Sequence, residues 1–229
     1  MQKDNTTPYH SQDYDANVLN TLPYYQSYHQ ETINLIKSIN TEPKNWLDTG
    51  CGTGTMINLA VKEFPKTKFL LLDPADSMVQ QARMKFCNLS KNRLKFLKPS
   101  TTQDFNEKLE EKVDVITAIQ CHHYLSPRDR KKAVQICYDN LKENGIFVTF
   151  ENIRPLTKKG VEIGKEYWKK FQLEHGRDIK EIEPQLKRFD VEYFPITVEE
   201  HLKLLRESGF KIVEILWYSY LQAGFYCIK

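Results

Sequence analysis

Three glycines at alternate positions follow an apolar segment and an acid in residues 46–55. The glycines are Gly50, Gly52 and Gly54, and the acid is Asp48. Glycine lets a chain turn tightly and approach a ligand closely, and a helix that begins after such a turn offers unpaired N–H groups and the positive end of its dipole. The stretch therefore predicts a loop that binds the carboxylate or phosphate of a nucleoside cofactor.

The spacing of these residues separates the possible cofactors. In the dinucleotide fingerprint, Gly-x-Gly-x-x-Gly, the third glycine would stand one residue later than Gly54. The apolar segment 69–73 ends in Asp73, a carboxylate suited to binding the two hydroxyls of a ribose. Together the two features favour a nucleoside cofactor other than a dinucleotide. The alternative is that the glycines form a structural turn and that Asp73 is a helix-capping or solvated acid.

Four stretches of the chain resemble the class I S-adenosylmethionine-dependent methyltransferases. They are LDTGCGTG at 47–54, LLLDPADSM at 70–78, DVITAIQCHHYL at 114–125 and LKENGIFVTFEN at 141–152. The resemblance implies that S-adenosylmethionine is the methyl donor. It places the glycines around the methionine part of the donor, Asp48 at the loop and the donor amino group, and Asp73 at the ribose.

The resemblance also implies a position for the adenine. It lies beside Ser100 and Thr101, where this chain departs from the family because Lys98-Pro99-Ser100-Thr101 replaces the usual acidic residue. An ordinary polar turn is the alternative for these two residues. The segment after the fourth strand lies beside the sulfonium in the family, which makes Gln120 a further candidate for donor binding.

A histidine pair follows Gln120. Histidine titrates near neutrality, so His122 and His123 are candidates for a catalytic base, with structural hydrogen bonding as the alternative. Adjacent histidines point apart, and no carboxylate with ligand spacing accompanies them, so the sequence predicts no metal site.

Strand-like and helical segments alternate from Asn45 onward, which is typical of a doubly wound α/β fold with a parallel sheet. Expected strands are 46–48, 69–73, 94–97, 113–119 and 146–150, followed by 210–217 and 220–228. Expected helices are 56–64, 77–86, 127–141 and one beginning at Val198, with Ser77 and Ser126 as N-caps and Gly145 as a helix stop.

The resemblance implies a Rossmann-like sheet of seven strands in the order 3-2-1-4-5-7-6, with strand seven antiparallel and a helical cap. Residues 1–42 are expected to form an N-terminal helical cap segment and residues 43–154 the cofactor-binding core. Residues 155–196 are expected to form a helical, aromatic cap insertion, because this segment is too long and aromatic for a simple connection. Residues 197–229 would complete the core with its last helix and terminal hairpin.

Composition excludes several classes of protein. No apolar run is long enough to span a bilayer, and the first ten residues lack the apolar core of a signal peptide, so we expect a cytoplasmic protein without a membrane partner. Five scattered cysteines without a C-x-x-C pair argue against a disulfide framework. A net charge of +3 is too small to indicate nucleic-acid binding, and the basic cluster 128–132 is expected to be a solvated helix face.

The leading functional prediction is methyl transfer to a small-molecule acceptor by in-line displacement, with the two cap segments enclosing the acceptor. One alternative is an enzyme of the tRNA wobble-uridine pathway, because the YD…LPYY leader and the LW…AGFYCIK ending are similar to carboxy-S-adenosylmethionine synthases. Those enzymes use an arginine on the last helix to hold the extra carboxylate, a position that falls near Leu204, with Arg206 as the only nearby substitute. Another alternative is a non-catalytic S-adenosylmethionine-binding protein, and the glycine spacing disfavours a dehydrogenase. The acceptor and the oligomeric state stay open.

Overall fold

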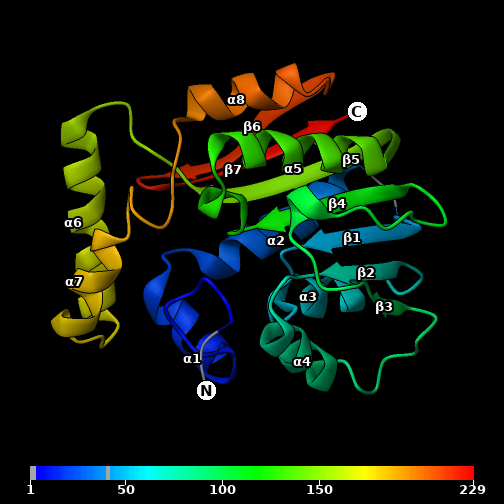
Figure 1. Ribbon diagram of the computed structural model, residues 1–229, viewed down its shortest axis with the longest axis horizontal. Helices are drawn as coiled ribbons and strands as arrows, with labels where there is room; N and C mark the ends of the chain where they lie inside the picture. The colour runs from blue at the N-terminus through cyan, green and yellow to red at the C-terminus, as the bar shows by residue number, and fades with distance from the viewer. Residues whose placement is uncertain (1–3, 40–41) are drawn as a thin grey trace.

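Seven strands form one mixed sheet in the computed structural model, which describes residues 4–39 and 42–229 (Figure 1). The strand order is β3-β2-β1-β4-β5-β7-β6, with β1 to β5 parallel and β7 antiparallel to both of its neighbours. This confirms the predicted order and the antiparallel seventh strand. The strands are β1 (Asn45–Thr49), β2 (Lys68–Leu72), β3 (Leu94–Phe96), β4 (Val113–Ile119), β5 (Leu141–Asn152), β6 (Ile212–Ser219) and β7 (Gln222–Ile228).

Helices cover both faces of the sheet, as Figure 1 shows. On one face lie α5 (Pro127–Asn140) and α8 (Val198–Glu207), and on the other lie α2 (Tyr25–Ser38), α3 (Thr55–Glu63) and α4 (Asp76–Lys85). Helices α6 (Lys158–Glu174) and α7 (Ile179–Lys187) pack together beside the carboxyl ends of the parallel strands. Helix α1 (Ser11–Thr21) lies between α4 and α6, and two short 3-10 turns are η1 (Thr102–Asp104) and η2 (His122–Tyr124).

Local sequence signals account for the starts of α5 and α8. The Ser126 hydroxyl accepts from the Asp129 N–H at the start of α5, with Pro127 as the first helical residue, which confirms Ser126 as an N-cap. Thr197 and Glu200 form a capping box at the start of α8. These caps fix where the chain leaves the loops that surround the carboxyl end of the sheet.

Two predicted boundary signals were wrong. Ser77 is not an N-cap: α4 begins at Asp76, and the carboxylate of Asp4 accepts hydrogen bonds from the backbone N–H and the hydroxyl of Ser77. Gly145 does not end a helix, because Leu141 already pairs with Val113 and α5 must stop before it. The glycine lies instead within β5, beside the irregularity where the register between β4 and β5 shifts.

The strand β4 has the predicted bounds, whereas β5 begins at Leu141 rather than Ile146. The other predicted strands differ from the structure by one or two residues at their ends. Residues 1–3 and 40–41 of the predicted cap segment 1–42 lie outside the described residues. The division into four segments stays a prediction.

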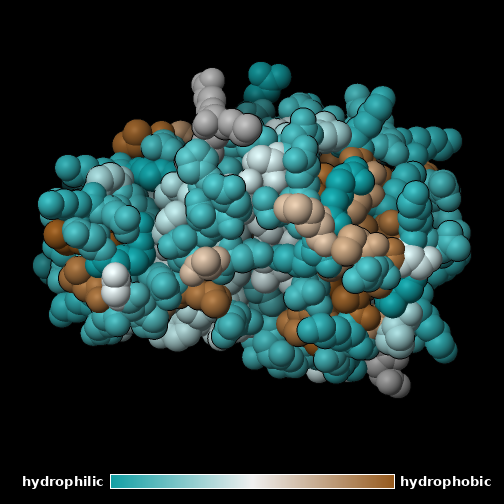
Figure 2. All heavy atoms as spheres, turned by 90° about the horizontal axis from the view of Figure 1, so that it is seen from below, coloured by the Kyte–Doolittle hydropathy of each residue, from teal (hydrophilic) through white to brown (hydrophobic). Residues whose placement is uncertain are grey.

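The surface is mostly polar. Figure 2 shows one face on which hydrophobic residues gather in separate groups among hydrophilic ones. Within residues 4–39 and 42–229, none of the helices combines the length and the apolar character needed to cross a membrane.

Candidate functional site

Three cavities meet at the carboxyl end of β1, β2 and β4. The largest, the cofactor cavity, has a volume of 170 Å³ and borders the inner chamber of 50 Å³ and the recess of 30 Å³. The cofactor cavity is lined by loops that follow these strands and by the segment before α1. Its lining residues include Asp4, Asn5, Thr6, Thr7, Tyr14, Gly50, Gly52, Asp73, Met78, Thr101, Thr102, Gln103, Gln120, Cys121, His122 and Tyr124.

The glycine loop follows β1, and all three glycines have positive φ angles, of 66° at Gly50, 53° at Gly52 and 79° at Gly54. A Cβ atom at Gly50 would lie 2.6 Å from Cβ of Cys121, and one at Gly54 would lie 2.5 Å from the Phe86 ring. A Cβ atom at Gly52 would meet nothing within 4 Å. Gly50 and Gly52 therefore line the cofactor cavity, whereas Gly54 shapes the turn into α3 and does not line it.

Asp73 lies directly after β2 and is 8% exposed at the cofactor cavity. Its two oxygens accept hydrogen bonds from the N–H groups of Gly52, at 2.8 Å, and Ala75, at 2.9 Å. Burial raises the pKa of Asp73, and these two hydrogen bonds oppose the rise. The carboxylate thus fixes the glycine loop and keeps acceptor capacity for further donors, since a carboxylate has about four lone-pair positions.

Asp48 is the acidic residue of β1 and lines the recess. Its carboxylate accepts a hydrogen bond of 2.6 Å from the Thr117 hydroxyl, which itself accepts from the Trp46 indole at 3.0 Å. Burial raises the pKa of Asp48 to about 7. A cationic group in the recess would favour the ionised form, so Asp48 is suited to a donor amino group.

Three residues that line the cofactor cavity carry a buried polar side-chain atom without a hydrogen-bond partner among the described residues. The atoms are Nδ2 of Asn5, Oε1 of Gln103 and Nε2 of His122. Buried polar groups are normally paired, so three unpaired atoms at one cavity indicate a polar ligand. Together with the open space above Gly52, they show that the cavity fits a nucleoside cofactor.

The predicted adenine residues are only partly placed at this cavity. Thr101 lines it, with its hydroxyl donating to Asp104, whereas Ser100 does not and donates its hydroxyl to the Thr101 carbonyl. Thr102 and Gln103 follow as lining residues that the sequence prediction missed. The sequence did not predict the short helix η1, which contains both residues. A turn of 3-10 helix brings the residues after Thr101 back toward the cavity.

Gln120 lies where β4 ends and lines both the cofactor cavity and the inner chamber. Its φ angle is 57°, an uncommon conformation for a residue other than glycine. The Gln120 N–H donates to the Phe150 carbonyl at 2.7 Å, which helps to hold the residue in place. A strained backbone at a cavity wall is typical of a functional position.

Glu151 is fully buried in β5 and binds the histidine turn η2. It accepts from the N–H groups of His122 (3.2 Å) and His123 (2.9 Å), from Nδ1 of His123 (2.8 Å) and from the Thr149 hydroxyl (2.8 Å). Burial opposes ionisation, but the hydrogen bonds from His123 and Thr149 help to outweigh it and lower the pKa of Glu151 to about 2. Nε2 of His123 lies 3.2 Å from Nδ2 of Asn152. Both ring nitrogens of His123 are therefore engaged, which makes it a structural histidine.

His122 has a different environment. Its ring lies 6.3 Å from that of Phe147, in the core under α5 and α8, and its Nε2 is buried without a partner among the described residues. Burial lowers the pKa of His122 to about 4, which makes it a weak proton acceptor. His201 of α8 has the same features, with an unpartnered Nε2 and a pKa lowered by burial to about 3. The geometry thus gives no support to a base at His122 or His123, and the role stays a prediction.

Arg130 corrects the prediction that residues 128–132 form a solvated helix face. It is 2% exposed, and its guanidinium donates to the carbonyls of His122, Leu125 and Phe194. Helical spacing could have predicted this burial, because Arg130 lies on the same face of α5 as the buried residues Ala133, Val134 and Cys137. Arg130 joins the histidine turn to the end of the cap insertion.

The inner chamber lies between the histidine turn, α1 and the cap helices α6 and α7. Most of the large side chains that line it are aromatic. Four residues line both the chamber and the cofactor cavity. These shared residues form the boundary between the two spaces. They are Thr7, Tyr14, Gln120 and Tyr124.

Tyr14 occupies the junction of all three cavities. Its hydroxyl lies 3.5 Å from that of Tyr25, and burial raises the pKa of Tyr14 well above its usual value. The hydroxyl is therefore a hydrogen-bond donor at neutral pH. Three other tyrosines do not line these cavities: Tyr28 donates to the Pro23 carbonyl in the core, and Tyr218 and Tyr220 are exposed.

A strap of residues 4–9 lies across the cofactor cavity and the inner chamber. Asp4 binds the start of α4, and the Thr6 carbonyl accepts from Arg188 at the end of α7. Tyr9 bonds the Thr21 hydroxyl and lies under the Arg177 guanidinium. The strap connects the sheet to the cap insertion and forms part of the lining of both spaces.

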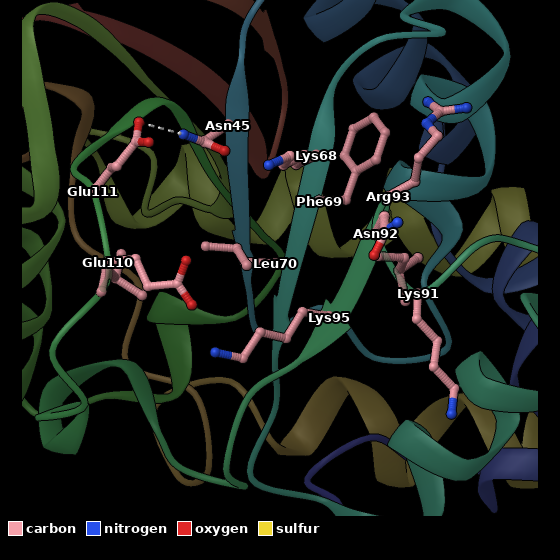
Figure 3. A pocket seen from close by; sticks show the side chains of 12 residues that line it. Asn45, Lys68, Phe69, Leu70, Lys91, Asn92, Arg93, Lys95, Glu110 and Glu111 are labelled. Carbon is pink, nitrogen blue, oxygen red and sulfur yellow. Dashed lines mark hydrogen bonds between the residues drawn. The ribbon is translucent and has the colours of Figure 1, made fainter.

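A separate hollow of 270 Å³ lies at the opposite, amino end of β1 to β3 (Figure 3). Its labelled charged side chains come from several segments, as Figure 3 shows, and two of them pair with residues beside the hollow. Lys44 binds Glu111 at 2.8 Å, and Lys95 lies 3.7 Å from Glu107. None of the predicted site residues lines this hollow.

The comparisons with known proteins agree with this geometry. Residues 47–147 match a family described as a methyltransferase domain. Among curated proteins, the chain is 28% identical over 208 residues to the carboxy-S-adenosyl-L-methionine synthase of Campylobacter lari, covering 88% of this chain and 84% of that protein.

Solved structures share the fold at low sequence identity. A candidate O-methyltransferase from Nostoc punctiforme PCC 73102 aligns with 96% of this chain at 14% identity and a TM-score of 0.67, and the chain spans 59% of that longer protein. The magnesium protoporphyrin IX methyltransferase of Synechocystis PCC 6803, solved with bound SAH (S-adenosylhomocysteine), aligns with 90% of this chain and 83% of its own length at 13% identity and a TM-score of 0.63.

Proposed function

Because the chain is a class I S-adenosylmethionine-dependent methyltransferase by domain and fold, we propose that it transfers a methyl group to a small molecule held in the inner chamber. One observation carries the proposal. The inner chamber borders the cofactor cavity along Tyr14, Gln120 and Tyr124, which line both spaces. A donor and an acceptor bound in these two spaces would face each other across that boundary.

The residues that would hold the donor follow from the site. Gly50 and Gly52 would border its methionine part, Asp48 would accept from its amino group and Asp73 would accept from its ribose hydroxyls. Gln103 and Thr101 lie on the side where the base would bind. When bound, S-adenosylmethionine supplies a methyl group on a positively charged sulfur.

The chain's own contribution to transfer is to position the acceptor and exclude water. Methyl transfer needs a nucleophile in line with the breaking bond and little charge stabilisation, so positioning is the main requirement. The strap, α1 and the cap helices close the inner chamber. The indole of Trp168 in α6 donates to the Thr21 carbonyl of α1, which holds the two cap segments together.

Calorimetric titration with S-adenosylmethionine, S-adenosylhomocysteine and NAD tests the donor assignment. We expect micromolar binding of the first two and none of NAD. Asp73→Asn should weaken the binding of both by about tenfold or more while leaving the unfolding transition in place, because it removes a charged acceptor of hydrogen bonds. Equal affinity of the wild type and the variant would remove Asp73 from the ribose site, and no binding by the wild type would overturn the proposal.

A second candidate is an activity like that of the carboxy-S-adenosyl-L-methionine synthases, which the relative from Campylobacter lari favours by name. The position of the last helix weighs against it. Arg206 is exposed in the last turn of α8 and lines neither the cofactor cavity nor the inner chamber. Leu204 packs into the core under α8. Mass spectrometry of any ligand that co-purifies with the protein separates the two, because a carboxylated donor would favour the second candidate.

A further inference from the structure

We propose that the acceptor is a small carboxylic acid, bound as its anion in the inner chamber with Arg188 as its charge partner. The proposal rests on the methyltransferase function above and adds the chemical class of the acceptor. It draws on three properties of the inner chamber: its size, its single permanent charge and the state of its titratable side chains.

The size of the chamber limits the acceptor. Its volume of 50 Å³ corresponds to the space of about four ordered water molecules. Aromatic side chains of Tyr124, Trp168 and Tyr193 form much of the wall, and their rings pack edge to face, as between Tyr124 and Tyr193 at 5.9 Å. Such walls leave room for a short or flat molecule and exclude a nucleotide of RNA.

The charge of the chamber selects an anion. Arg188 carries the only permanent charge among the described residues that line it, and no aspartate, glutamate or lysine is among them. The Arg188 side chain is 11% exposed, while Glu192, which accepts from its Nε at 2.8 Å, is 55% exposed on the solvent side. Solvent screens the Glu192 charge, so the guanidinium keeps a positive field on the chamber side.

The guanidinium reaches the wall shared with the cofactor cavity. Burial raises the pKa of Tyr124, and the charge of Arg188 opposes this rise, which places the cation near the Tyr124 hydroxyl. Arg188 also stacks over the Tyr193 ring at 5.3 Å and donates to the Thr6 carbonyl. These contacts hold the guanidinium in one orientation, with Nε directed at Glu192 and Nη2 at Thr6, which leaves the N–H groups of Nη1 to donate to a carboxylate.

Among the described residues that line the chamber, none is suited to remove a proton from the acceptor. Both ring nitrogens of His123 are engaged by Glu151 and Asn152. Burial raises the pKa values of Tyr14, Tyr124 and Tyr193, so these hydroxyls stay protonated at neutral pH. An alcohol or a phenol would have to lose its proton without help, whereas a carboxylic acid is already ionised near pH 7.

The chemistry of an ionised acceptor fits this environment. A carboxylate oxygen forms the new O–CH3 bond with a lone pair while the S–CH3 bond breaks and its electron pair stays on sulfur. No proton moves, and the anion and the sulfonium both become neutral, as an ester and a thioether. Arg188 binds an anion whose charge fades in the transition state, so it should act mainly on acceptor affinity, that is on KM more than on kcat.

Binding experiments test the proposal without knowledge of the natural acceptor. The protein is saturated with S-adenosylhomocysteine and titrated by NMR with propanoate and with propanamide, which have the same shape but differ in charge. We expect propanoate to bind about tenfold more tightly than propanamide, because a hydrogen bond to a charged group contributes more than a neutral one. Arg188→Gln should abolish this difference, and Arg188→Lys should retain part of it.

The same series distinguishes a charge partner from a structural residue. If Arg188 only fixed the strap, Arg188→Gln would weaken propanoate, propanamide and S-adenosylhomocysteine alike. The exposed Arg206→Gln is the matched control and should change none of them. Equal affinity of propanoate and propanamide, or no binding of propanoate, would overturn the carboxylate proposal while leaving the methyltransferase function intact. Failure of S-adenosylhomocysteine to bind the wild type would overturn the function itself.

Discussion

The two ends of the parallel strands hold charged groups in opposite ways. At the carboxyl end, Asp48, Asp73 and Glu151 are buried and bonded to backbone N–H groups or hydroxyls. At the amino end, the charged groups are exposed, as in the ion pair of Lys44 with Glu111 beside the hollow. Buried carboxylates carry a desolvation cost that a fold retains where the groups hold a geometry or bind a ligand.

The comparison also shows that cavity size is a poor guide to function. The hollow at the amino end is larger, at 270 Å³ against 170 Å³ for the cofactor cavity. Only the carboxyl end combines positive φ angles, orphaned polar atoms and perturbed pKa values. The difference between the two ends can be tested by matched substitutions, beginning with the largest expected effect.

Removal of a buried carboxylate should have the largest effect. Glu151→Ala leaves the donors of His122, His123 and Thr149 without an acceptor, and we expect the free energy of unfolding to fall by about 3–5 kcal/mol. Urea unfolding measures the change, and Glu151→Gln keeps the shape if the alanine variant does not fold. Glu111→Ala, at the exposed amino end, should unfold like the wild type. Similar losses for the two glutamates would contradict the comparison.

The glycine loop should separate stability from binding. Gly52→Ala places a methyl group in open space above the loop, so it should cost about 1 kcal/mol of stability for its positive φ yet weaken S-adenosylhomocysteine binding at least about tenfold. Gly50→Ala brings its methyl group against Cys121 and should lose more stability than Gly52→Ala. Calorimetry measures the affinity of both variants for S-adenosylhomocysteine, and urea unfolding measures their stability. An unchanged affinity in Gly52→Ala would mean that the donor does not approach the loop at that position.

Acid should weaken the fold through the buried histidines. Burial lowers the pKa of His201 to about 3, whereas a histidine in the unfolded chain titrates near 6.5. Between about pH 6.5 and 3, His201 is therefore protonated in the unfolded state and neutral in the folded state. Stability should therefore fall as the pH is lowered through this window, by up to about 1.4 kcal/mol per pH unit for one such group. Asp48, with its raised pKa, acts in the opposite direction between pH 7 and 4.

His201→Gln isolates this contribution, since Asp48 is common to both proteins. The variant should lose less stability than the wild type between pH 6.5 and 5, as measured by urea midpoints at each pH. His175→Gln, at an exposed position on the surface, is the matched control for the substitution itself. Parallel pH profiles for the wild type and His201→Gln would show that His201 does not titrate on unfolding.

Substitutions at the amino end should have the smallest effect. Lys68→Gln and Lys95→Gln alter the hollow of Figure 3 but lie at the far end of the strands from Asp73. We expect less than about a twofold change in S-adenosylhomocysteine affinity, because screening by salt is strong over that distance. A larger change by calorimetry would mean that the two ends of the sheet are coupled.

Much of the core could be predicted from sequence because its signals are local. The glycine loop, Asp73 and the N-cap Ser126 each depend on residues within a few positions of one another. The boundary errors arose where a distant contact overrides a local signal. Ser77 is bonded by Asp4, and Gly145 lies beside the pairing of Leu141 with Val113.

The inner chamber could not be predicted in the same way, since it is assembled from residues far apart in sequence. Arg188 meets Thr6 across 182 positions, and Trp168 meets Thr21 across 147. The aromatic content of the cap insertion is evident from the sequence. Which of these side chains face a cavity depends on contacts with distant residues, which the sequence does not give. The lone cation Arg188 became informative only when its neutral surroundings were known.

The position of the strap has a practical consequence for how the protein should be produced. Asp4 bonds the start of α4 and lines the cofactor cavity, so an affinity tag joined to the amino end is tethered within a few residues of the donor site. A tag joined after Lys229 leaves from the other end of the sheet, where Ile228 pairs with Ile146. Material tagged at the carboxyl end is therefore the appropriate choice for ligand titrations, with an untagged preparation as its reference.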